Sequence, residues 1–419
     1  MNVTARTRPG NGPETAGGHP SDVSVKGFSR AGHTPSLLAS LLHFDVSFMV
    51  WVLLGALGAY VAADLDLTSA QKGLMVAVPP LGGCGFRLIL GSVVERIGIK
   101  RTGMASMGLT LVPLLWGWVG GGTYAQVLGI GLLLGVAGAS FAVALPLVSR
   151  WYPPEFQGLA LGIAGAGNSG TIIAILAAPR LAEHVGWHGV FGLASLPVGL
   201  TWLVFAFFAK EPPARPGPQA GSALSLLEQA DARWLSLFYL VTFGGFVGLS
   251  GYLSIFFVDR FDMSKLSAAG YAAMCAAAGS LLRPLGGALA DRLGGTRVLT
   301  GALMIVAALA SALASLPGLG LTVALLMVTM GTLGMGNGAV FQVVPQRFPS
   351  AVGPMTGLVG AAGGLGGFLL PFALGSLEGS TGTFAAGFMV FAAAAVLASL
   401  AVTRRQRAWR DAWALDVAV

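Results

Sequence analysis

The chain has 419 residues, of which 55% are hydrophobic and only 10% are charged, and its mean hydropathy is +0.77. Soluble domains carry about 25% charged residues, so this chain has too little charge to cover the surface of a soluble protein of its size. Its two cysteines, Cys84 and Cys275, exclude a secreted disulfide scaffold. The 63 glycines follow no Gly-X-Y period and are concentrated in apolar runs, as in tightly packed membrane helices. We therefore expect a polytopic protein embedded in a lipid bilayer.

The predicted elements begin after residues 1–36, which are rich in Pro, Gly, Ser and Thr and are expected to form a disordered tail. A membrane-spanning helix needs about 20 mainly apolar residues. Twelve such runs follow the tail: 37–62, 69–94, 101–119, 124–149, 157–181, 189–209, 233–258, 265–290, 297–316, 318–342, 352–376 and 382–403. The chain is thus predicted to be an all-α membrane protein with 12 transmembrane helices.

The longest polar gap between these runs divides the chain into two halves. It contains four prolines and separates the sixth run from the seventh, as a linker does. The predicted organisation is a six-helix bundle over 37–209, a linker over 210–232, a second six-helix bundle over 233–403 and a basic tail over 404–419.

The basic residues predict the orientation in the membrane. With the N-terminus inside, 18 of the 24 Lys and Arg residues lie on the inner side, 4 lie on the outer side, and Arg87 and Arg283 lie within helices. Basic residues favour the cytoplasmic side of a membrane. We therefore expect a protein of the plasma membrane with both termini in the cytoplasm. The net charge of +7 is then a topology signal, and no nucleic-acid partner is inferred from it.

The two halves contain an internal repeat. The second run ends in the segment from Arg87 to Arg101, and the eighth run ends in the segment from Arg283 to Arg297. At a constant offset of 196, six residues coincide in type: Arg, Gly, an acid, Arg, Gly and Arg. Such a repeat indicates that the halves have the same architecture.

The pattern G-x-x-x-[DE]-R-x-G-x-[KR]-[KR], which the second copy matches except at Thr296, resembles the inner-loop signature of the major facilitator superfamily. That resemblance covers about residues 37–403 and implies two pseudo-symmetric six-helix bundles with a substrate site between them. By the same analogy, two acid–arginine pairs are expected to form a cytoplasmic gate that closes in one state and opens in the other. These are Glu95, Arg96, Asp291 and Arg292. Helix capping and topology would also account for them.

Arg87 and Arg283 each lie eight residues before the acid of their half, near the middle of the bilayer. A central arginine costs about 2.5–3.5 kcal/mol on insertion scales, so two at equivalent positions call for an explanation. They could be structural arginines bonded to helix carbonyls. We favour a clamp for a small anion, because an anion relieves both the burial cost and the mutual repulsion, and the guanidinium fork suits a planar oxyanion.

Glycine recurs every three to four residues in the fifth, tenth and eleventh runs, which lets helices approach closely. Packing does not explain the two amides in these runs, Asn168 and Asn337. A buried amide must find partners, and both could donate to an anion. No Gly-Lys-Ser/Thr follows the glycines, so a phosphate loop is excluded.

The segment from Ala164 to Gly170 resembles the nitrate signature of the nitrate/nitrite porter family, and the glycine runs around Asn337 and from Gly357 to Gly367 resemble its second copy. The family resemblance implies that Arg87 and Arg283 bind nitrate or nitrite directly. It also implies hydrogen bonds from Asn168 and Tyr239, with Phe141 and Phe243 packed on the faces of the anion. Nitrate is flat, monovalent and weakly hydrated, which fits two planar guanidinium groups and aromatic rings.

The expected function is therefore a secondary transporter for nitrate, nitrite or both. An empty site with two facing positive charges should hinder closure, which favours nitrate/nitrite exchange. Asp45 in the first run is a candidate for proton coupling, or a structural partner of its neighbours. The alternatives are a carrier for another small anion such as a carboxylate and, more remotely, an anion sensor. No enzyme activity, cofactor or metal is expected, and the pair His184 and His188 is read as incidental.

Overall fold

The computed structural model describes residues 25–213, 224–348 and 351–416. All regular elements in these ranges are helices, which confirms the predicted all-α class. The first half contains α1 (Val25–Ala31), α2 (Thr34–Trp51), α3 (Leu53–Ala56), α4 (Gly58–Asp64), α5 (Ser69–Ile97), α6 (Ile99–Val119), α7 (Tyr124–Gly138), α8 (Phe141–Trp151), α9 (Pro154–Gly165), the 3₁₀ turn η1 (Ala166–Ser169) and α10 (Gly170–Phe208). The second contains the 3₁₀ turn η2 (Ser225–Glu228), α11 (Ala230–Phe261), α12 (Lys265–Leu293), α13 (Gly295–Ala314), α14 (Leu319–Arg347), α15 (Val352–Thr381) and α16 (Ala385–Asp416).

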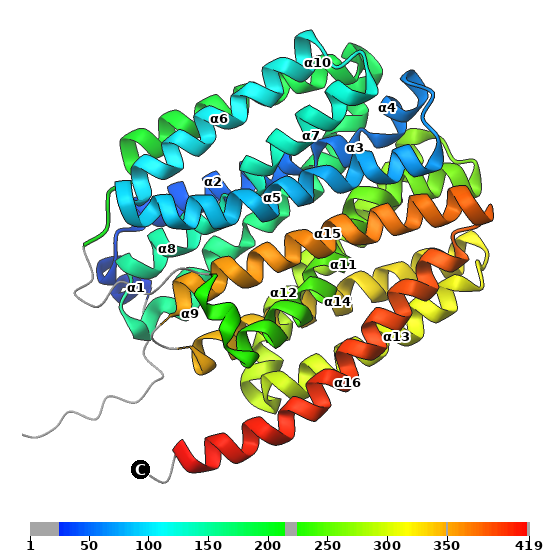
Figure 1. Ribbon diagram of the computed structural model, residues 1–419. Helices are drawn as coiled ribbons and strands as arrows, with labels where there is room; N and C mark the ends of the chain where they lie inside the picture. Colours follow the sequence, from blue (N-terminus) through cyan, green and yellow to red (C-terminus); the bar gives the residue numbers. More distant parts are fainter. Residues whose placement is uncertain (1–24, 214–223, 349–350, 417–419) are drawn as a thin grey trace, which may run out of the picture.

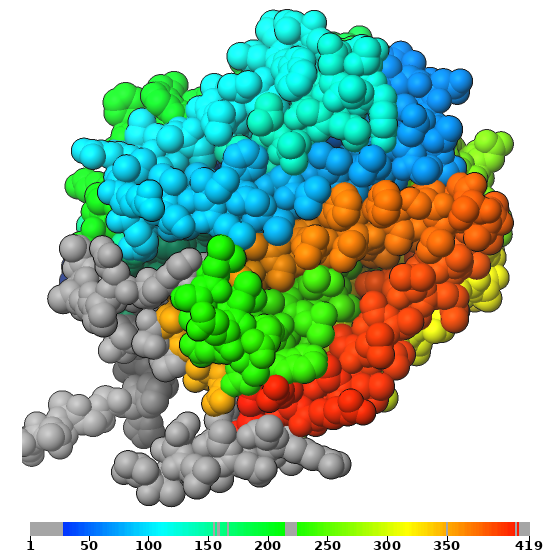
Figure 2. Space-filling view, in the orientation of Figure 1, coloured from blue at the N-terminus to red at the C-terminus, as the bar shows by residue number. Residues whose placement is uncertain are grey.

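The two halves form two groups of helices that meet along α5 and α15 (Figure 1). The blue elements of the first half and the orange elements of the second half adjoin along this seam in Figure 2. Helix α1 and the last turns of α16 lie at the same end of the molecule, which we call the α1 end. The α5–α15 seam is therefore where a site between the halves can form.

The described helices account for the twelve predicted runs. Within the described residues, ten helical segments are long and apolar enough to cross a membrane, and two of these segments join consecutive helices, α7 with α8 and α9 with α10. The first run is divided into α2, α3 and α4 by breaks at Val52 and Leu57. The fifth and sixth runs share α10, which turns sharply at Gly186, where φ is +69°. A kinked or interrupted helix can persist in a membrane protein where neighbouring elements satisfy the freed backbone groups.

The sequence repeat is visible in the ends of α5 and α12, which are 29 residues long in both cases. Each helix starts after a hydroxyl cap, Thr68 or Ser264, whose side chain accepts a backbone N–H three residues later. Each ends at a glycine, Gly98 or Gly294, with φ at +92°, a conformation that favours glycine. The 196-residue offset thus holds at both caps, so Arg87 and Arg283 occupy the same position in helices of equal length.

Both predicted tails are shorter than expected in the described residues. Residues 25–36 contain α1 and the start of α2, and α16 continues through the predicted tail to Asp416. The ring of Phe28 stacks on Tyr152 at 4.9 Å, and the Trp409 indole N–H donates to the Asp231 carboxylate at 2.8 Å. One aromatic contact can order a segment that is otherwise polar. Because the overall composition of such a segment stays polar, composition alone predicts disorder there. Residues 1–24 lie outside the described residues.

Candidate functional site

The side chain of Arg87 is buried between the two halves and is only 1% exposed. Its Nε donates to the Gly138 carbonyl at 3.0 Å, and its Nη1 donates to the Gly360 carbonyl. Gly138 belongs to the first half and Gly360 to the second, so one guanidinium group connects both bundles. Three aromatic rings surround it, those of Trp51, Phe141 and Phe243, with centres 5.1, 5.9 and 5.3 Å from the guanidinium carbon.

A break in the fourth predicted run provides the first of these carbonyls. Helix α7 ends at Gly138 and α8 begins at Phe141. In a continuous helix the Gly138 carbonyl would accept the N–H of Ala142. Here the Ala142 N–H donates to the Ala139 carbonyl at 2.9 Å instead. The freed carbonyl of Gly138 is therefore available to Arg87, and irregular backbone occurs where it faces a buried polar group.

Arg283 has a different environment from that of Arg87. It is half-buried, and its Nη1 is buried with no hydrogen-bond partner among the described residues. Its guanidinium carbon lies 5.7 Å from the ring centre of Phe341, and the Tyr239 side chain lies within hydrogen-bonding reach. An unpartnered buried donor on a charged group is costly, so this group is suited to bind an anion.

A continuous set of aromatic contacts joins the surroundings of the two arginines. The Tyr239 and Phe243 rings are parallel, with centres 4.8 Å apart, and the Phe341 ring meets Tyr239 edge-on at 5.0 Å. Phe341 also lies 5.6 Å from Phe141 across the interface between the halves. The structure therefore brings together five of the predicted site residues, namely Arg87, Arg283, Tyr239, Phe141 and Phe243.

The two predicted amides are buried beside this region, without a described contact to either guanidinium group. Asn168 is 3% exposed and lies in η1, which packs against α12, the helix of Arg283. Asn337 is 1% exposed and lies in α14; a Cβ on the next residue, Gly338, would lie 2.3 Å from the Arg283 carbonyl. The side-chain oxygens of Asn168 and Asn337 have no hydrogen-bond partner in the described part of the chain. A half-turn of either amide exchanges its oxygen for its NH₂ group, so each could present donors to an anion.

Sequence reasoning missed Phe341 as a site residue and gave Trp51 no role in the site. Phe341 follows Asn337 by four residues, so the two lie on one helix face, and this spacing was the available signal. Trp51 donates from its indole N–H to the Pro79 carbonyl at 2.9 Å, which fixes the ring beside Arg87. The roles of the Gly138 and Gly360 carbonyls depend on tertiary contacts and leave no sequence signal.

The end opposite α1 is closed by contacts between the halves. Lys72 of α5 forms an ion pair with Asp259 of α11, with both carboxylate oxygens 2.8 Å from Nζ. Helices α5 and α15 touch at Gly73 and Gly375, where a Cβ on Gly375 would lie 2.7 Å from the Gly73 Cα. The ammonium group of Lys265 lies 4.6 Å from the ring centre of Tyr60, again across the interface.

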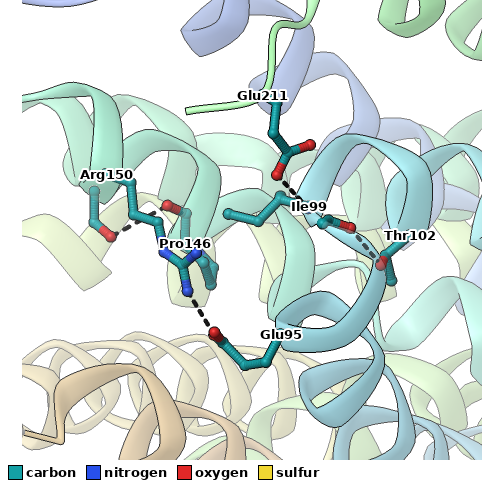
Figure 3. A network of polar contacts seen from close by, with 8 residues as sticks. Glu95, Ile99, Thr102, Pro146, Arg150 and Glu211 are labelled. Carbon is teal, nitrogen blue, oxygen red and sulfur yellow. Dashed lines mark hydrogen bonds and ion pairs between the residues drawn. The ribbon is translucent and has the colours of Figure 1, made fainter. Parts of the chain in front are cut away.

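The predicted gate residues at the α1 end are exposed, and the described ion pairs there lie within one half. Glu95 pairs with Arg150 of the same half at 2.5 Å, as Figure 3 shows. In the same view the Glu211 carboxylate accepts the backbone N–H of Ile99, and it also accepts that of Lys100, so it caps α6. No ion pair of Arg96, Asp291 or Arg292 is found within the described ranges.

Small residues show the same difference along α15. A Cβ on Gly364 would lie 3.0 Å from the carbonyl oxygen of Pro80 in α5, so the two halves are packed backbone to backbone at this part of the helix. A Cβ on Gly357, nearer the α1 end, would have nothing described within 4 Å. The interface is therefore tight from the site to the end opposite α1 and looser toward the α1 end.

Comparisons with known proteins agree with this architecture. Residues 39–371 match the family model described as Major Facilitator Superfamily. A Bacillus subtilis strain 168 protein named nitrite extrusion protein is 33% identical, with 85% of this chain and 90% of that protein aligned. The probable nitrate/nitrite transporter NarK2 of Mycobacterium tuberculosis H37Rv is 34% identical over 88% of this chain and 95% of that protein. The chain belongs to the nitrate/nitrite porter family of the major facilitator superfamily.

A further relative and a solved structure extend the comparison. The probable nitrate/nitrite antiporter NarK1 of Thermus thermophilus is 32% identical over 80% of this chain and 83% of that protein. Among solved structures, a bacterial homologue of the human lysosomal transporter Spinster has a TM-score of 0.68 at 17% identity, over 88% of this chain and 96% of that one. The latter likeness concerns the fold alone. As a member of this superfamily, the protein is an integral membrane transporter and not an enzyme.

Proposed function

We propose that this porter carries nitrate and nitrite across the cytoplasmic membrane by alternating access. The observation that carries the proposal is the position of Arg87 and Arg283. They come from equivalent points of the two halves and share one aromatic set, in which the Arg283 Nη1 is buried without a described partner. The names of the relatives support the choice of nitrate and nitrite.

The chemistry of the site suits a small flat anion. Arg283 offers a buried Nη1 that has no described partner, and Arg87 supplies a second fixed positive charge. Guanidinium forks match planar oxyanions, and aromatic rings can cover the faces of a weakly hydrated ion. Asn168, Asn337 and Tyr239 would add hydrogen bonds, while Phe141, Phe243 and Phe341 would exclude water. A carboxylate with a bulky substituent would have to displace this aromatic packing.

The orientation and the gates are part of the proposal. The α1 end would face the cytoplasm, since most basic residues lie there. The pair of Lys72 and Asp259 would then close the outer side in this conformation. In the opposite state, Glu95, Arg96, Asp291 and Arg292 would close the inner side by pairing across the halves. Ion pairs at opposite ends can form and break in turn in this way as the two halves rock against each other.

Exchange of nitrate for nitrite follows from the charge of the site. Without an anion, closing the halves brings two guanidinium groups together, and their repulsion opposes closure. With an anion bound, this cost falls, so the loaded porter would change conformation more readily than the empty one. The expected consequence is faster flux when a substrate anion is present on both sides.

The test is nitrate flux into proteoliposomes that contain nitrite or only buffer, with and without a pH gradient. We expect uptake to be fastest with nitrite inside. Equal rates with and without internal nitrite would contradict exchange, and uptake only under a pH gradient would indicate proton symport. Acetate and formate serve as competitors, because a carboxylate that displaces nitrate at lower concentration would overturn the substrate assignment.

A further inference from the structure

Asp45 of α2 contacts the turn that holds Asn168. Its half-buried carboxylate accepts the hydroxyl of Ser169 at 2.6 Å and the backbone N–H of Gly170. These residues directly follow Asn168 at the junction of η1 and α10. The fifth predicted run is broken where η1 passes into α10, and the Asp45 side chain from the first run holds this junction.

The backbones of α2 and the turn are also in close contact. A Cβ on Gly170 would lie 1.9 Å from the Asp45 carbonyl oxygen, and a Cβ on Gly167 would lie 2.6 Å from the Phe44 ring. Only glycine permits this approach at either position. The turn bearing Asn168 therefore rests directly on the segment of α2 that supplies the carboxylate.

The turn depends on this support because its own hydrogen bonding is weak. Four residues of 3₁₀ helix have poorer hydrogen-bond geometry than an α-helix. Ser169 is the N-cap residue of α10, but it makes no cap bond to that helix, and its hydroxyl donates to Asp45. A carboxylate at the first turn of a helix also interacts favourably with the helix dipole. Asp45 thus caps α10 from a different helix.

We propose that Asp45 is a positioning residue for Asn168. It holds the turn so that the buried amide lies beside the arginine helix α12, and it acts on the anion only through this amide. This inference rests on the proposed function, in which Asn168 binds the transported anion. It assigns Asp45 a role as a fixed hydrogen-bond acceptor, whereas proton coupling would require the same carboxylate to gain and lose a proton.

The experiment measures nitrate binding to the purified full-length protein by calorimetry. We expect Ser169→Ala and Asp45→Ala to weaken binding by about tenfold, since a hydrogen bond to a charged group is lost. Ser47→Ala is the matched control, because it removes a buried hydroxyl of α2 that contacts His43 at 3.3 Å and not the turn. In an Asn168→Ala background, Asp45→Ala should cause no further loss. A further tenfold loss in that background, or wild-type affinity of Ser169→Ala, would overturn the inference.

Two further readouts separate this role from the alternatives. Amide hydrogen exchange of residues 166–170 should rise in Asp45→Ala and Ser169→Ala without nitrate, and unchanged exchange would refute the positioning role whatever the substrate. Absence of nitrate binding by the wild type would instead refute the proposed function. Asp45→Asn should leave any dependence of uptake on a pH gradient intact; loss of that dependence in Asp45→Asn alone would identify Asp45 as a proton site and refute a fixed acceptor.

Discussion

Arg87 and Arg283 occupy the same position of the repeat, but their environments differ. Each lies ten residues before the end of a 29-residue helix with the same type of cap at both ends. Arg87 is bonded to carbonyls of both halves and surrounded by three rings. Arg283 lies near one tyrosine and one phenylalanine, and its Nη1 has no partner in the described part of the chain. The same helix position therefore holds a fixed group in one half and an available donor in the other.

The difference between the arginines comes from their neighbours. The α7–α8 break frees the Gly138 carbonyl in the first half. In the second half, the corresponding tenth run is the continuous helix α14, and the residue equivalent to Gly138, Gly334, lies inside that helix. In this conformation Arg87 is bonded to helix carbonyls, as a structural arginine would be. Arg283 keeps a donor without a described partner, as expected of a group that binds an anion. An anion would bring the two together by competing with the Gly360 carbonyl for Arg87.

The largest expected effect is the loss of nitrate transport when either arginine is replaced, and only the replacement of Arg87 should also lower the stability of the protein. Arg87→Lys and Arg283→Lys should each reduce nitrate transport by about a hundredfold, because hydrogen bonds to charged groups are worth about 1.5–3 kcal/mol each and lysine lacks the fork. Arg87→Lys should in addition lower the melting temperature of the nitrate-free protein, since one ammonium group cannot join the Gly138 and Gly360 carbonyls. Thermal unfolding in detergent and flux in proteoliposomes measure the two effects. Equal destabilisation by both substitutions would contradict the comparison.

A smaller effect is expected from the hydroxyl of Tyr239, which lies beside Arg283. Tyr239→Phe should weaken nitrate binding by about fivefold to tenfold without changing the melting temperature, because one hydrogen bond near the anion is lost. Tyr252→Phe is the matched control: it lies on the same helix, is 1% exposed, and its hydroxyl has no described partner. Calorimetry with nitrate gives both values, and equal losses in the two variants would argue against a role of Tyr239 in binding.

The fold and the equivalent helix positions of the two arginines could be predicted from the sequence, because both follow from local patterns. Hydropathy marks the runs, and the 196-residue repeat fixes where Arg87 and Arg283 lie. The family resemblance then identified Tyr239, Phe141 and Phe243, which do meet at the arginines. The partners of Arg87 could not be predicted, because a helix break at Ala139 and a carbonyl 273 residues away depend on tertiary packing. Asp45 is visible in the sequence as a charge in a membrane run, but its contact with Ser169 joins residues 124 positions apart and could not be predicted.

The smallest expected effect concerns the ion pair of Lys72, which is a second side-chain connection from α5 to the other half besides Arg87. Helix α12 has no charged residue at the equivalent position. Lys72 corresponds to Ala268 in the repeat, and its pair with Asp259 is partly exposed, so it should contribute about 0.2–1 kcal/mol. Lys72→Ala should therefore raise the population open at this end by about fivefold at most. A single cysteine at Val76, which lines a small cavity between the halves, reports this opening in a protein without Cys84 and Cys275.

Labelling of that cysteine by an impermeant maleimide should become faster in Lys72→Ala and in Asp259→Ala. The exchanged pair, Lys72→Asp with Asp259→Lys, should restore the slow rate, because the attraction is regained with the charges reversed. Raising the salt concentration should accelerate labelling of the wild type but not of Lys72→Ala, since screening acts on an ion pair that the variant no longer has. If the exchanged pair labels as fast as the single variants, packing at Gly73 and Gly375 holds this end closed, and α5 then connects the halves through a side-chain charge only at Arg87.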